Sequence, residues 1–413
     1  MSGAATPVGD LGVWTLVALY VPVLIVSWAV TLIATPIVRL IAIRTGVVDR
    51  PDEARKLHRR PVAYLGGVAV FIGVLAGIAT SYLLDVPIAF RPVPITVVLG
   101  MIAVVATGFG DDVWGWDPRL KIMGQLIAAA GLSMYGIGTQ TAAAFLGYFL
   151  GTSQLGFEIP LFGGIPIDIT EWIGVAIVAV MVLGGCNASN LIDGLDGLLS
   201  GTTAIIGGGL LVISLMLALH LTSADLTHLG ETLPPEVANV EGLTLAGARI
   251  ALCLALIGAC VGFLAFNFNP ALIFLGDAGS LLLGYLCVVI ILTLGELGQT
   301  HFVLAGLIVF GLPIADTVLA IFRRKIQGLS ASSPDANHLH HILLRHLGTV
   351  KQAVLGMWGI EVIFAMIGVA LVALSTAGSI RVLATYVVFI GVFGAIAVIG
   401  SLMGLRAGRE KSS

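Results

Sequence analysis

Long apolar runs, separated by short polar segments, dominate this sequence of 413 residues. Most runs are about 20 residues long, the length that an α-helix needs to cross the hydrocarbon core of a bilayer. Hydrophobic residues make up 58% of the chain and charged residues 10%, against about 25% charged residues in soluble domains. Transmembrane strands would be about half as long and would alternate. We therefore expect an all-α, polytopic integral membrane protein.

The apolar runs predict about 11 transmembrane helices in a single domain over residues 1–413, because no polar stretch is long enough to fold separately. The expected spans are 12–42, 64–84, 93–110, 120–138, 171–187, 198–220, 246–266, 279–295, 301–322, 352–375 and 380–404. Residues 139–150 are too short to cross and are expected at the membrane interface. Residues 157–168, FEIPLFGGIPID, predict a small hairpin with Gly-Gly at its turn.

The positions of the basic residues predict how these helices are oriented. Of the 20 Lys and Arg residues, 17 lie on the side reached by the odd-numbered spans. Arg91, Arg249 and Arg381 lie on the other side. Because Lys and Arg accumulate on the cytoplasmic side of membranes, we expect the N-terminus outside and the C-terminus in the cytoplasm.

Unusual polar residues gather at the expected cytoplasmic ends of the odd-numbered spans. They are Asp111 and Asp112 after the third span, Asn187, Asn190, Asp193 and Asp196 after the fifth, Asn267, Asn269 and Asp277 after the seventh, and Asp316, Arg323, Arg324, Lys325, His338, His340 and His341 at and after the ninth. Ionisable groups are costly inside a membrane and mark functional sites by default. Separate segments thus predict one active-site cleft that opens to the cytoplasm.

The acidic residues of these segments suggest a metal and a phosphate. Adjacent carboxylates repel each other, so Asp111 and Asp112 predict a neighbouring cation, either a divalent metal or Lys121. Asp277 lies in FLGDAGS, where a helix N-terminus with small residues would suit a phosphate. Its carboxylate would be a hard oxygen ligand for Mg²⁺, which binds through one or two carboxylates plus substrate phosphates.

Amides accompany the acids in NASNLIDGLDGL, residues 187–198. Asn187, Asn190 and Asp193 follow one another at three-residue intervals and so share one broad face of a helix end. Amides beside carboxylates suit the recognition of a nucleoside or a sugar.

Two loops on the same side carry the bases that phosphate groups need. Lys56 and His58 lie in the first loop, RTGVVDRPDEARKLHRRPVAYLGG, and form a candidate anion site. The second loop, residues 323–348, carries Arg323, His338, His340 and His341. A pyrophosphate or a sugar would fit this second set.

Acids for a metal, bases for phosphates and amides for a base or sugar predict phosphoryl transfer between a soluble nucleotide compound and a lipid. An ion-coupled transporter is the alternative from a different class, because intramembrane acids also mark ion pathways. Transporter sites lie near the bilayer midplane and often come in repeated halves. Here the acids lie at one face and the sequence shows no repeat, so an enzyme is favoured.

Five sequence blocks, in this order, resemble those of the polyprenyl-phosphate N-acetylhexosamine-1-phosphate transferases of glycosyltransferase family 4. The blocks are DRPDEARKLHRRPVAYLGG, GDDVWGWDPRLK, NASNLIDGLDGL, NFNPALIFLGDAGS, and PIADT followed by SPDANHLHH. The resemblance covers residues 36–350, whereas 351–413 hold two C-terminal helices without a motif. It implies a multi-pass protein of the plasma membrane with its active site facing the cytoplasm.

The resemblance implies that UDP-N-acetylhexosamine and polyprenyl phosphate give polyprenyl-diphospho-N-acetylhexosamine and UMP, with Mg²⁺, or alternatively Mn²⁺, as cofactor. The HLHH motif is similar to that of the branch using UDP-GlcNAc and undecaprenyl phosphate, the first membrane step of a cell-envelope polysaccharide. The alternative is the phospho-N-acetylmuramoyl-pentapeptide branch that makes lipid I, whose His-rich loop differs. The expected partners are the UDP-sugar, the polyprenyl phosphate and membrane lipids, with a homodimer left open and no nucleic acid.

The resemblance also implies roles for individual residues. Asp277 would bind Mg²⁺, and Asp111 and Asp112 would form the catalytic pair, with Asp112 as a second metal ligand. The nucleotide side would contact Asn190, Asp193, Asp196 and Asn267. Lys56 and His58 match the basic block of the family. Direct attack of the lipid phosphate on the β-phosphorus and a covalent phospho-sugar intermediate on an aspartate both remain open.

Overall fold

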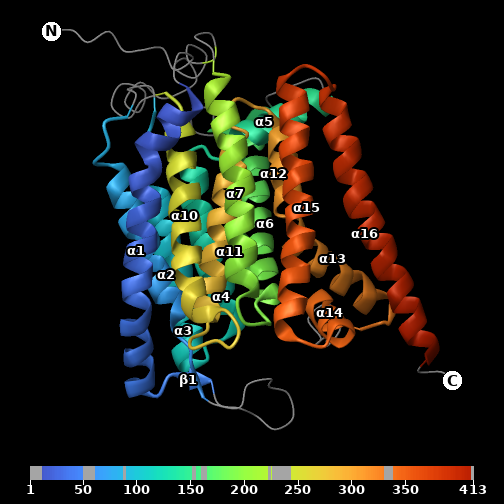
Figure 1. Cartoon of the computed structure of the whole chain (residues 1–413). Coiled ribbons are helices and arrows are strands. Elements are labelled where there is room, and N and C mark those ends of the chain that lie inside the picture. The colour runs from blue at the N-terminus through green and yellow to red at the C-terminus, as the bar shows by residue number, and fades with distance from the viewer. Residues whose placement is uncertain are drawn as a thin grey trace.

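The computed structural model of the chain describes residues 12–49, 61–86, 90–150, 155–159, 165–221, 225, 243–329 and 338–410. These residues form a bundle of long, roughly parallel helices (Figure 1), together with two short hairpins. Within the described part, eight helices are long and apolar enough to cross a membrane, and a bent helix pair adds a ninth. The all-α, polytopic membrane fold expected from the apolar runs is thus confirmed.

The long helices lie where the apolar runs predict them. They are α1 (Val13–Thr45), α3 (Ile95–Trp114), α6 (Ile169–Ile192), α7 (Leu198–Leu219), α10 (Ala246–Asn267), α11 (Gly276–Thr293), α15 (Val350–Thr376) and α16 (Val382–Glu410). The shorter helices are α2 (Gly66–Ser81), α4 (Pro118–Met134), α5 (Thr139–Leu150), α12 (Thr300–Val309), α13 (Gly311–Ile326) and α14 (Leu339–Leu347). Because α2 and α4 have 16 and 17 residues, short of the roughly 20 that a straight crossing needs, a total of 11 spans stays a prediction.

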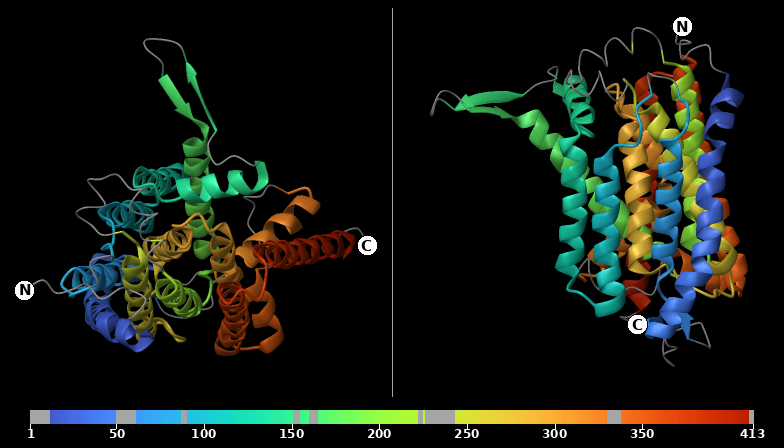
Figure 2. Two further views of the ribbon diagram at one scale, coloured as in Figure 1. Left: turned by 90° about the horizontal axis from the view of Figure 1, so that it is seen from above. Right: turned by 90° about the vertical axis from the view of Figure 1, so that its left-hand side faces the viewer.

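Two antiparallel hairpins complete the fold. Strand β1 (Val48–Asp49) pairs with β2 (Val62–Ala63), and β3 (Gly156–Ile159) pairs with β4 (Ile165–Asp168). The second hairpin is the one predicted over 157–168, although its Gly-Gly turn lies outside the described residues. Figure 2 shows that it reaches sideways from the bundle.

Helices α3, α6 and α10 end, and α4, α7 and α11 begin, at the same end of the bundle, the lower end in Figure 1. We call this the site end. Helix α11 lies in the middle of the molecule, packed against α2, α3, α6, α7, α10 and α12, and its residues 278–293 are all buried. The first turn of α11 is therefore surrounded by the ends of its neighbours.

Glycines let two of these neighbours come close to the first turn of α11. A Cβ on Gly67 of α2 would overlap the backbone nitrogen of Gly279, and one on Gly108 of α3 would lie 2.5 Å from Cα of Ala278. Small residues allow this kind of backbone approach between helices in lipid. The position of the α11 N-terminus thus depends on Gly67 and Gly108.

We expect Gly67→Ala to lower the free energy of unfolding by about 1–3 kcal/mol, because an added methyl group meets backbone that cannot rotate away. The matched control is Gly184→Ala on α6, where a Cβ would meet nothing within 4 Å and helix propensity favours Ala by up to about 1 kcal/mol. The midpoint of thermal unfolding in detergent measures both. Equal midpoints for the two variants would contradict the prediction.

The ninth predicted span, 301–322, differs from the expectation of one continuous helix. It is divided into α12 and α13, which meet at an angle of 79°. Pro313, in the first turn of α13, has no N–H for a continuous helical ladder. The backbone N–H of Leu312 instead donates to Oε2 of Glu361, a buried residue of α15, at 3.2 Å. A partner side chain thus compensates for the break, which turns α13 aside at the site end.

Candidate active site

The site end gathers most of the polar residues that the sequence predicts for the cleft. Asp111 and Asp112 come from the last turn of α3 and Lys121 from the first turn of α4, while Asp277 lies in the first turn of α11. Asn187 and Asn190 lie in the last turns of α6, and Asp193 is its C-cap. Asp196 follows in the α6–α7 connection, and Asn267 is the last residue of α10.

Lys121 joins two of the acids. Its Nζ lies 2.6 Å from Oδ2 of Asp277 and 3.0 Å from Oδ2 of Asp111. The short α3–α4 turn produces this geometry, because Gly115 ends α3 in a left-handed conformation and Asp117 caps α4. The three side chains are between 17% and 24% exposed, so a ligand from outside can reach them. The predicted cation beside the aspartate pair is present as an ammonium group.

Asn190 contacts the other oxygen of Asp277. Its Nδ2 donates to Oδ1 of Asp277 at 2.8 Å and to Oγ of Ser280 at 2.9 Å. Both carboxylate oxygens of Asp277 therefore accept a hydrogen bond from a side chain of another helix. This fixes the carboxylate at the positive end of the α11 dipole.

Asp112 differs from its neighbour Asp111 in what it binds. Its two oxygens accept from the backbone N–H groups of Asp277 at 2.7 Å and Ala278 at 3.0 Å. It thus caps α11 from another helix. Gly276 makes room for the cap, since a Cβ there would lie 2.5 Å from Oδ2 of Asp112. The carboxylate predicted as a metal ligand is already engaged by two backbone donors.

Asp193 and Asp196 lie on the connection between α6 and α7. Burial raises the pKa of Asp193 to about 8, with further contributions from the negative charges of Asp277, Asp112 and Asp196. Asp196 accepts hydrogen bonds from Nδ2 of Asn269 at 2.8 Å and from the backbone of Ala271 at 3.0 Å. Asp196 therefore connects this loop to the α10–α11 connection.

Asn267 also joins the α6–α7 connection to the α10–α11 connection. Its Oδ1 accepts from the N–H of Gly197 at 3.1 Å and from Oγ of Ser200 at 2.9 Å, and its Nδ2 donates to the carbonyl of Ile273 at 3.0 Å. The side chain is 3% exposed, so its amide groups are used by the chain itself. Asn267 therefore holds the two connections together, and the nucleotide contact that the resemblance implies stays a prediction.

Asn187 lies one turn before Asn190 and is also engaged. Its Nδ2 donates to Oε1 of Gln125 at 3.0 Å and to the carbonyl of Leu183 at 2.7 Å. The first contact joins α6 to α4, the helix that carries Lys121.

Lys56 and His58, predicted as an anion site, lie outside the described residues. The segment that follows them, from residue 61 onward, is hydrogen-bonded to the segment that precedes Asp277. Ala63 pairs with Ile273, and the N–H of Gly66 donates to the carbonyl of Phe274 at 2.9 Å. The end of the basic loop is therefore attached to the segment that leads into Asp277.

Tyr64, which follows this loop, is not among the predicted site residues. Its pKa is raised above the ordinary value by burial and by the charges of Asp112, Asp193 and Asp277. The tyrosine lies within the block PVAYLGG, but a single Tyr in an apolar block carries no signal of its own. Only the folded arrangement brings its ring to the acids.

The HLHH residues lie between α13 and the α6–α7 connection. Nδ1 of His338 lies 2.6 Å from Oδ2 of Asp316 on α13. The ring of His338 stacks on that of His340, and His340 contacts that of His341. A Cβ on Gly194 would overlap Nε2 of His340, so this ring packs on the residue after Asp193. Burial lowers the pKa of His340 to about 4, which keeps it neutral at pH 7.

Arg323 lies on α13, two turns beyond Asp316, and is 3% exposed. Residues seven apart lie on one side of a helix. The bend between α12 and α13 therefore brings Asp316 and Arg323 to the site end together.

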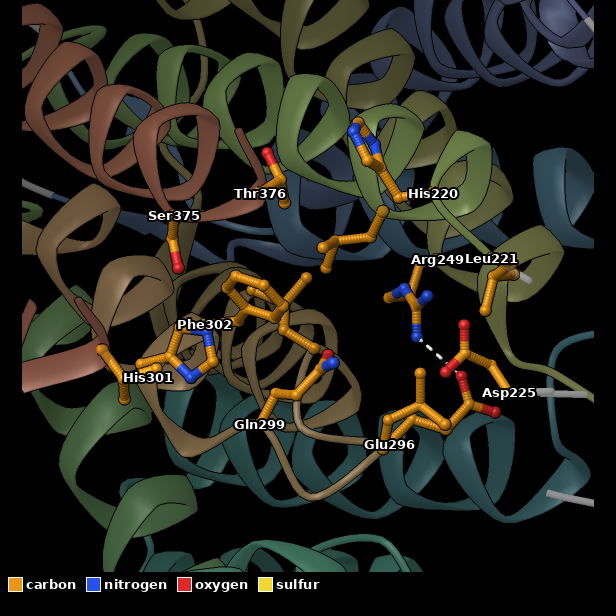
Figure 3. Close-up of a pocket in the computed structure, with 14 residues that line it drawn as sticks. His220, Leu221, Asp225, Arg249, Glu296, Gln299, His301, Phe302, Ser375 and Thr376 are labelled. Atoms are coloured by element: carbon orange, nitrogen blue, oxygen red, sulfur yellow. Dashed lines mark hydrogen bonds and ion pairs between the residues drawn. The ribbon is translucent and has the colours of Figure 1, made fainter. Parts of the chain in front are cut away.

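A separate cavity of about 370 Å³ lies at the opposite end of the bundle, among α7, α10, α12, α15 and the start of α16. Figure 3 shows Arg249 beside Glu296 in its wall. Nη1 of Arg249 lies 3.0 Å from Oε2 of Glu296 and donates to the carbonyl of Thr293 at 2.8 Å. None of the acids of the site end lines this cavity.

The acids can hold a cation, but they do not form a complete protein cage for one. In the described part of the chain, no group of three or more His, Cys, Asp or Glu residues has the geometry to hold a metal ion. Asp111 and Asp277 nevertheless share a positive group, the ammonium of Lys121, and remain accessible. This fits Mg²⁺, which commonly uses one or two carboxylates and completes its coordination with water and substrate phosphates.

Comparison with known proteins finds one matching family model and relatives that cover most of the chain. The family model of glycosyl transferase family 4 matches residues 94–295. The chain is 32% identical over 84% of its length to a probable undecaprenyl-phosphate N-acetylglucosaminyl 1-phosphate transferase of Bacillus subtilis, of which 83% is covered. It is 31% identical over 86% of its length to the decaprenyl-phosphate N-acetylglucosaminephosphotransferase of Mycolicibacterium smegmatis, covering 80%. A phospho-N-acetylmuramoyl-pentapeptide-transferase of Desulforudis audaxviator is 29% identical over 85% of this chain and 98% of its own.

Proposed function

Because the chain belongs to glycosyl transferase family 4, we propose that it transfers N-acetylglucosamine-1-phosphate from UDP-N-acetylglucosamine to a polyprenyl phosphate, with release of UMP. The observation that carries the proposal is the contact of Lys121 with both Asp111 and Asp277 in a chain with such relatives. The Bacillus and Mycolicibacterium relatives, both above 30% identity, are GlcNAc-1-phosphate transferases by name. An ion-coupled transporter has no support in these comparisons.

Asp277 and Asp111 would hold Mg²⁺, or Mn²⁺ in its place. When bound with the diphosphate of the UDP-sugar, the metal would offset the charge of the UMP leaving group. Asn190 orients Asp277 through its hydrogen bond of 2.8 Å. Asp112 stabilises the helix turn that presents Asp277, through its two bonds to backbone N–H groups.

The attacking group in this proposal is the phosphate of the lipid. A phosphomonoester has a second pKa near 6, so it is mostly a dianion at pH 7 and attack on the β-phosphorus needs no strong base. Lys121 would attract this dianion and hold it near the diphosphate. Asp111 or Asp112 would accept any residual proton of the lipid phosphate.

A covalent phospho-sugar on one of the two adjacent aspartates, Asp111 or Asp112, is the competing scheme. The two schemes differ in one measurement. Release of one equivalent of UMP from UDP-GlcNAc without any lipid would support the covalent scheme. A strict requirement for the lipid would support direct attack.

The proposal places the reaction at the cytoplasmic face of the plasma membrane. The helix ends that carry the acids are on the side expected to hold 17 of the 20 Lys and Arg residues, which favours the cytoplasm. A polyprenyl phosphate would stay in the bilayer, while the UDP-sugar would arrive from water.

The direct test supplies purified protein with Mg²⁺, undecaprenyl phosphate and, separately, UDP-GlcNAc, UDP-GalNAc and UDP-MurNAc-pentapeptide, and follows UMP. We expect UMP with UDP-GlcNAc alone. UMP only with the muramoyl substrate would retain the family and overturn the proposed substrate. Folded protein that releases no UMP with any of them would overturn the proposed function.

We expect EDTA to stop UMP release, and excess Mg²⁺ or Mn²⁺ to restore it, because the metal would offset the charge that develops on the UMP leaving group. Titration of the apoprotein with Mn²⁺, followed by electron paramagnetic resonance, gives a second readout. Full activity in EDTA would contradict a metal requirement. Unchanged Mn²⁺ binding in Asp277→Asn would contradict the assigned ligand.

A further inference from the structure

The buried carboxylate of Asp316 lies apart from the groups assigned to the reaction, yet its contacts are specific. It is 1% exposed and lies in α13, just after the bend. Its Oδ2 lies 2.6 Å from Nδ1 of His338, and its Oδ1 accepts from the backbone N–H of Leu339 at 2.7 Å. Both oxygens thus hold the first residues of α14.

These contacts determine which nitrogen of His338 carries the proton. A carboxylate only accepts hydrogen bonds, so Nδ1 donates to Asp316. In neutral imidazole the other nitrogen, Nε2, then has its lone pair free for a different partner. Asp316 fixes both the tautomer and the orientation of the ring.

The ring of His338 is connected to the acidic cluster through one neighbour. It stacks on His340, with ring centroids 5.7 Å apart and planes 11° apart. His340 in turn packs on Gly194, the residue after Asp193. A shift of His338 would therefore be transmitted to the connection that carries Asp193 and Asp196.

We propose that Asp316 is a positioning residue of the transferase reaction, which keeps the lone pair of His338 Nε2 available to accept a hydrogen bond from a hydroxyl or amide N–H group of the bound nucleotide sugar. The inference rests on the proposed function. Asp316 is 1% exposed and His338 7% exposed, so His338 is the member of the pair that lies nearer the surface of the site end. The bend between α12 and α13, where Glu361 accepts a hydrogen bond from Leu312, places Asp316 next to this histidine.

Asp316→Asn tests the inference with little change of shape. The amide oxygen can still accept from Leu339, but the NH₂ group then faces Nδ1 of His338. Nδ1 must become the acceptor, and Nε2 takes the proton. Residues that orient a histidine at metal sites are worth about 10–100-fold in affinity or activity, and we expect a loss of that size in kcat, with a much smaller change in KM for UDP-GlcNAc.

A double-mutant cycle separates positioning from a general structural effect. His338→Ala removes the partner and leaves the contact between Asp316 and Leu339 in place, so it keeps the test interpretable if Asp316→Asn folds poorly. In the His338→Ala background, Asp316→Asn is expected to cost almost nothing further in kcat. Thr317→Ala is the neighbouring control. The hydroxyl of Thr317 donates to the carbonyl of Pro313 within its own helix, at 2.9 Å, so this variant should keep the wild-type rate.

Two results would overturn the positioning role while the proposed function stands. One is wild-type kcat/KM in Asp316→Asn, and the other is a double variant whose loss equals the product of the two single losses. If the wild-type protein itself releases no UMP, the proposed function fails and the inference fails with it. The wild-type rate, measured first, distinguishes these cases.

Discussion

Asp277→Asn is expected to reduce UMP release by about 10²–10³-fold or more, the scale seen when one preorganised electrostatic group is removed from an active site. Both neighbours of Asp277 are donors, with Lys121 Nζ at 2.6 Å and Asn190 Nδ2 at 2.8 Å. An amide offers only one oxygen, so its NH₂ group must face one of these donors. The measurement is the initial rate of UMP release with UDP-GlcNAc and polyprenyl phosphate.

The matched control is Asp168→Asn at the opposite end of α6. Asp168 caps this helix by accepting from the N–H groups of Thr170 and Glu171 at 2.8 and 3.2 Å. Asn caps helices about as well as Asp, so the rate should stay at the wild-type value. A rate within tenfold of wild type in Asp277→Asn would remove Asp277 from the catalytic centre.

Glu296→Leu should lower the free energy of unfolding by about 3–5 kcal/mol, because it removes the carboxylate that forms the ion pair with buried Arg249. Arg249 is 3% exposed. Glu296 also accepts from the backbone N–H of Leu245 at 2.6 Å and from the hydroxyl of Thr244 at 3.0 Å. The loss of stability therefore has two sources: the broken ion pair and the two hydrogen bonds lost just before the start of α10. Unfolding in mixed micelles gives the free energy.

The double variant Arg249→Met/Glu296→Leu is the control for this prediction. Replacing both members of a buried ion pair by apolar residues is often neutral or stabilising, so most of the lost stability should return. The rate of UMP release per folded molecule should change little, because the pair lies at the end opposite to Asp277. A single variant as stable as the double would contradict the account.

The positions of the helices could be predicted because the length of an apolar run is a local property of the sequence. The spans expected at 352–375 and 380–404 are α15, Val350–Thr376, and α16, Val382–Glu410. The bend between α12 and α13 could not be predicted in this way. Pro313 marks a possible break, but the 79° angle and the partner of the freed Leu312 N–H, which is Glu361, 49 residues further along the chain, appear only in the folded structure.

The gathering of Asp111, Asn190 and Asp277 at one end of the bundle could be predicted, because their helix ends lie on the same side of the membrane. The separate role of each residue within the site could not be predicted. Asp111 and Asp112 are adjacent in sequence and differ only in their contacts, with a lysine for one and the N-terminus of α11 for the other. Asp316 stands out in the sequence as an unusual polar residue, but its role depends on His338, 22 residues away.

The cap that Asp112 forms on α11 has a consequence for the synthesis of the protein. The lysine that pairs with Asp111 follows after 10 residues, whereas the backbone donor of Asp112 comes 165 residues later. At roughly 5–20 residues per second, a ribosome needs about 10–30 s to add that length. During this interval the newly inserted α1 to α4 hold a carboxylate whose final partner does not yet exist. Until α11 arrives, Asp112 lacks the backbone N–H donors that it binds in the folded protein.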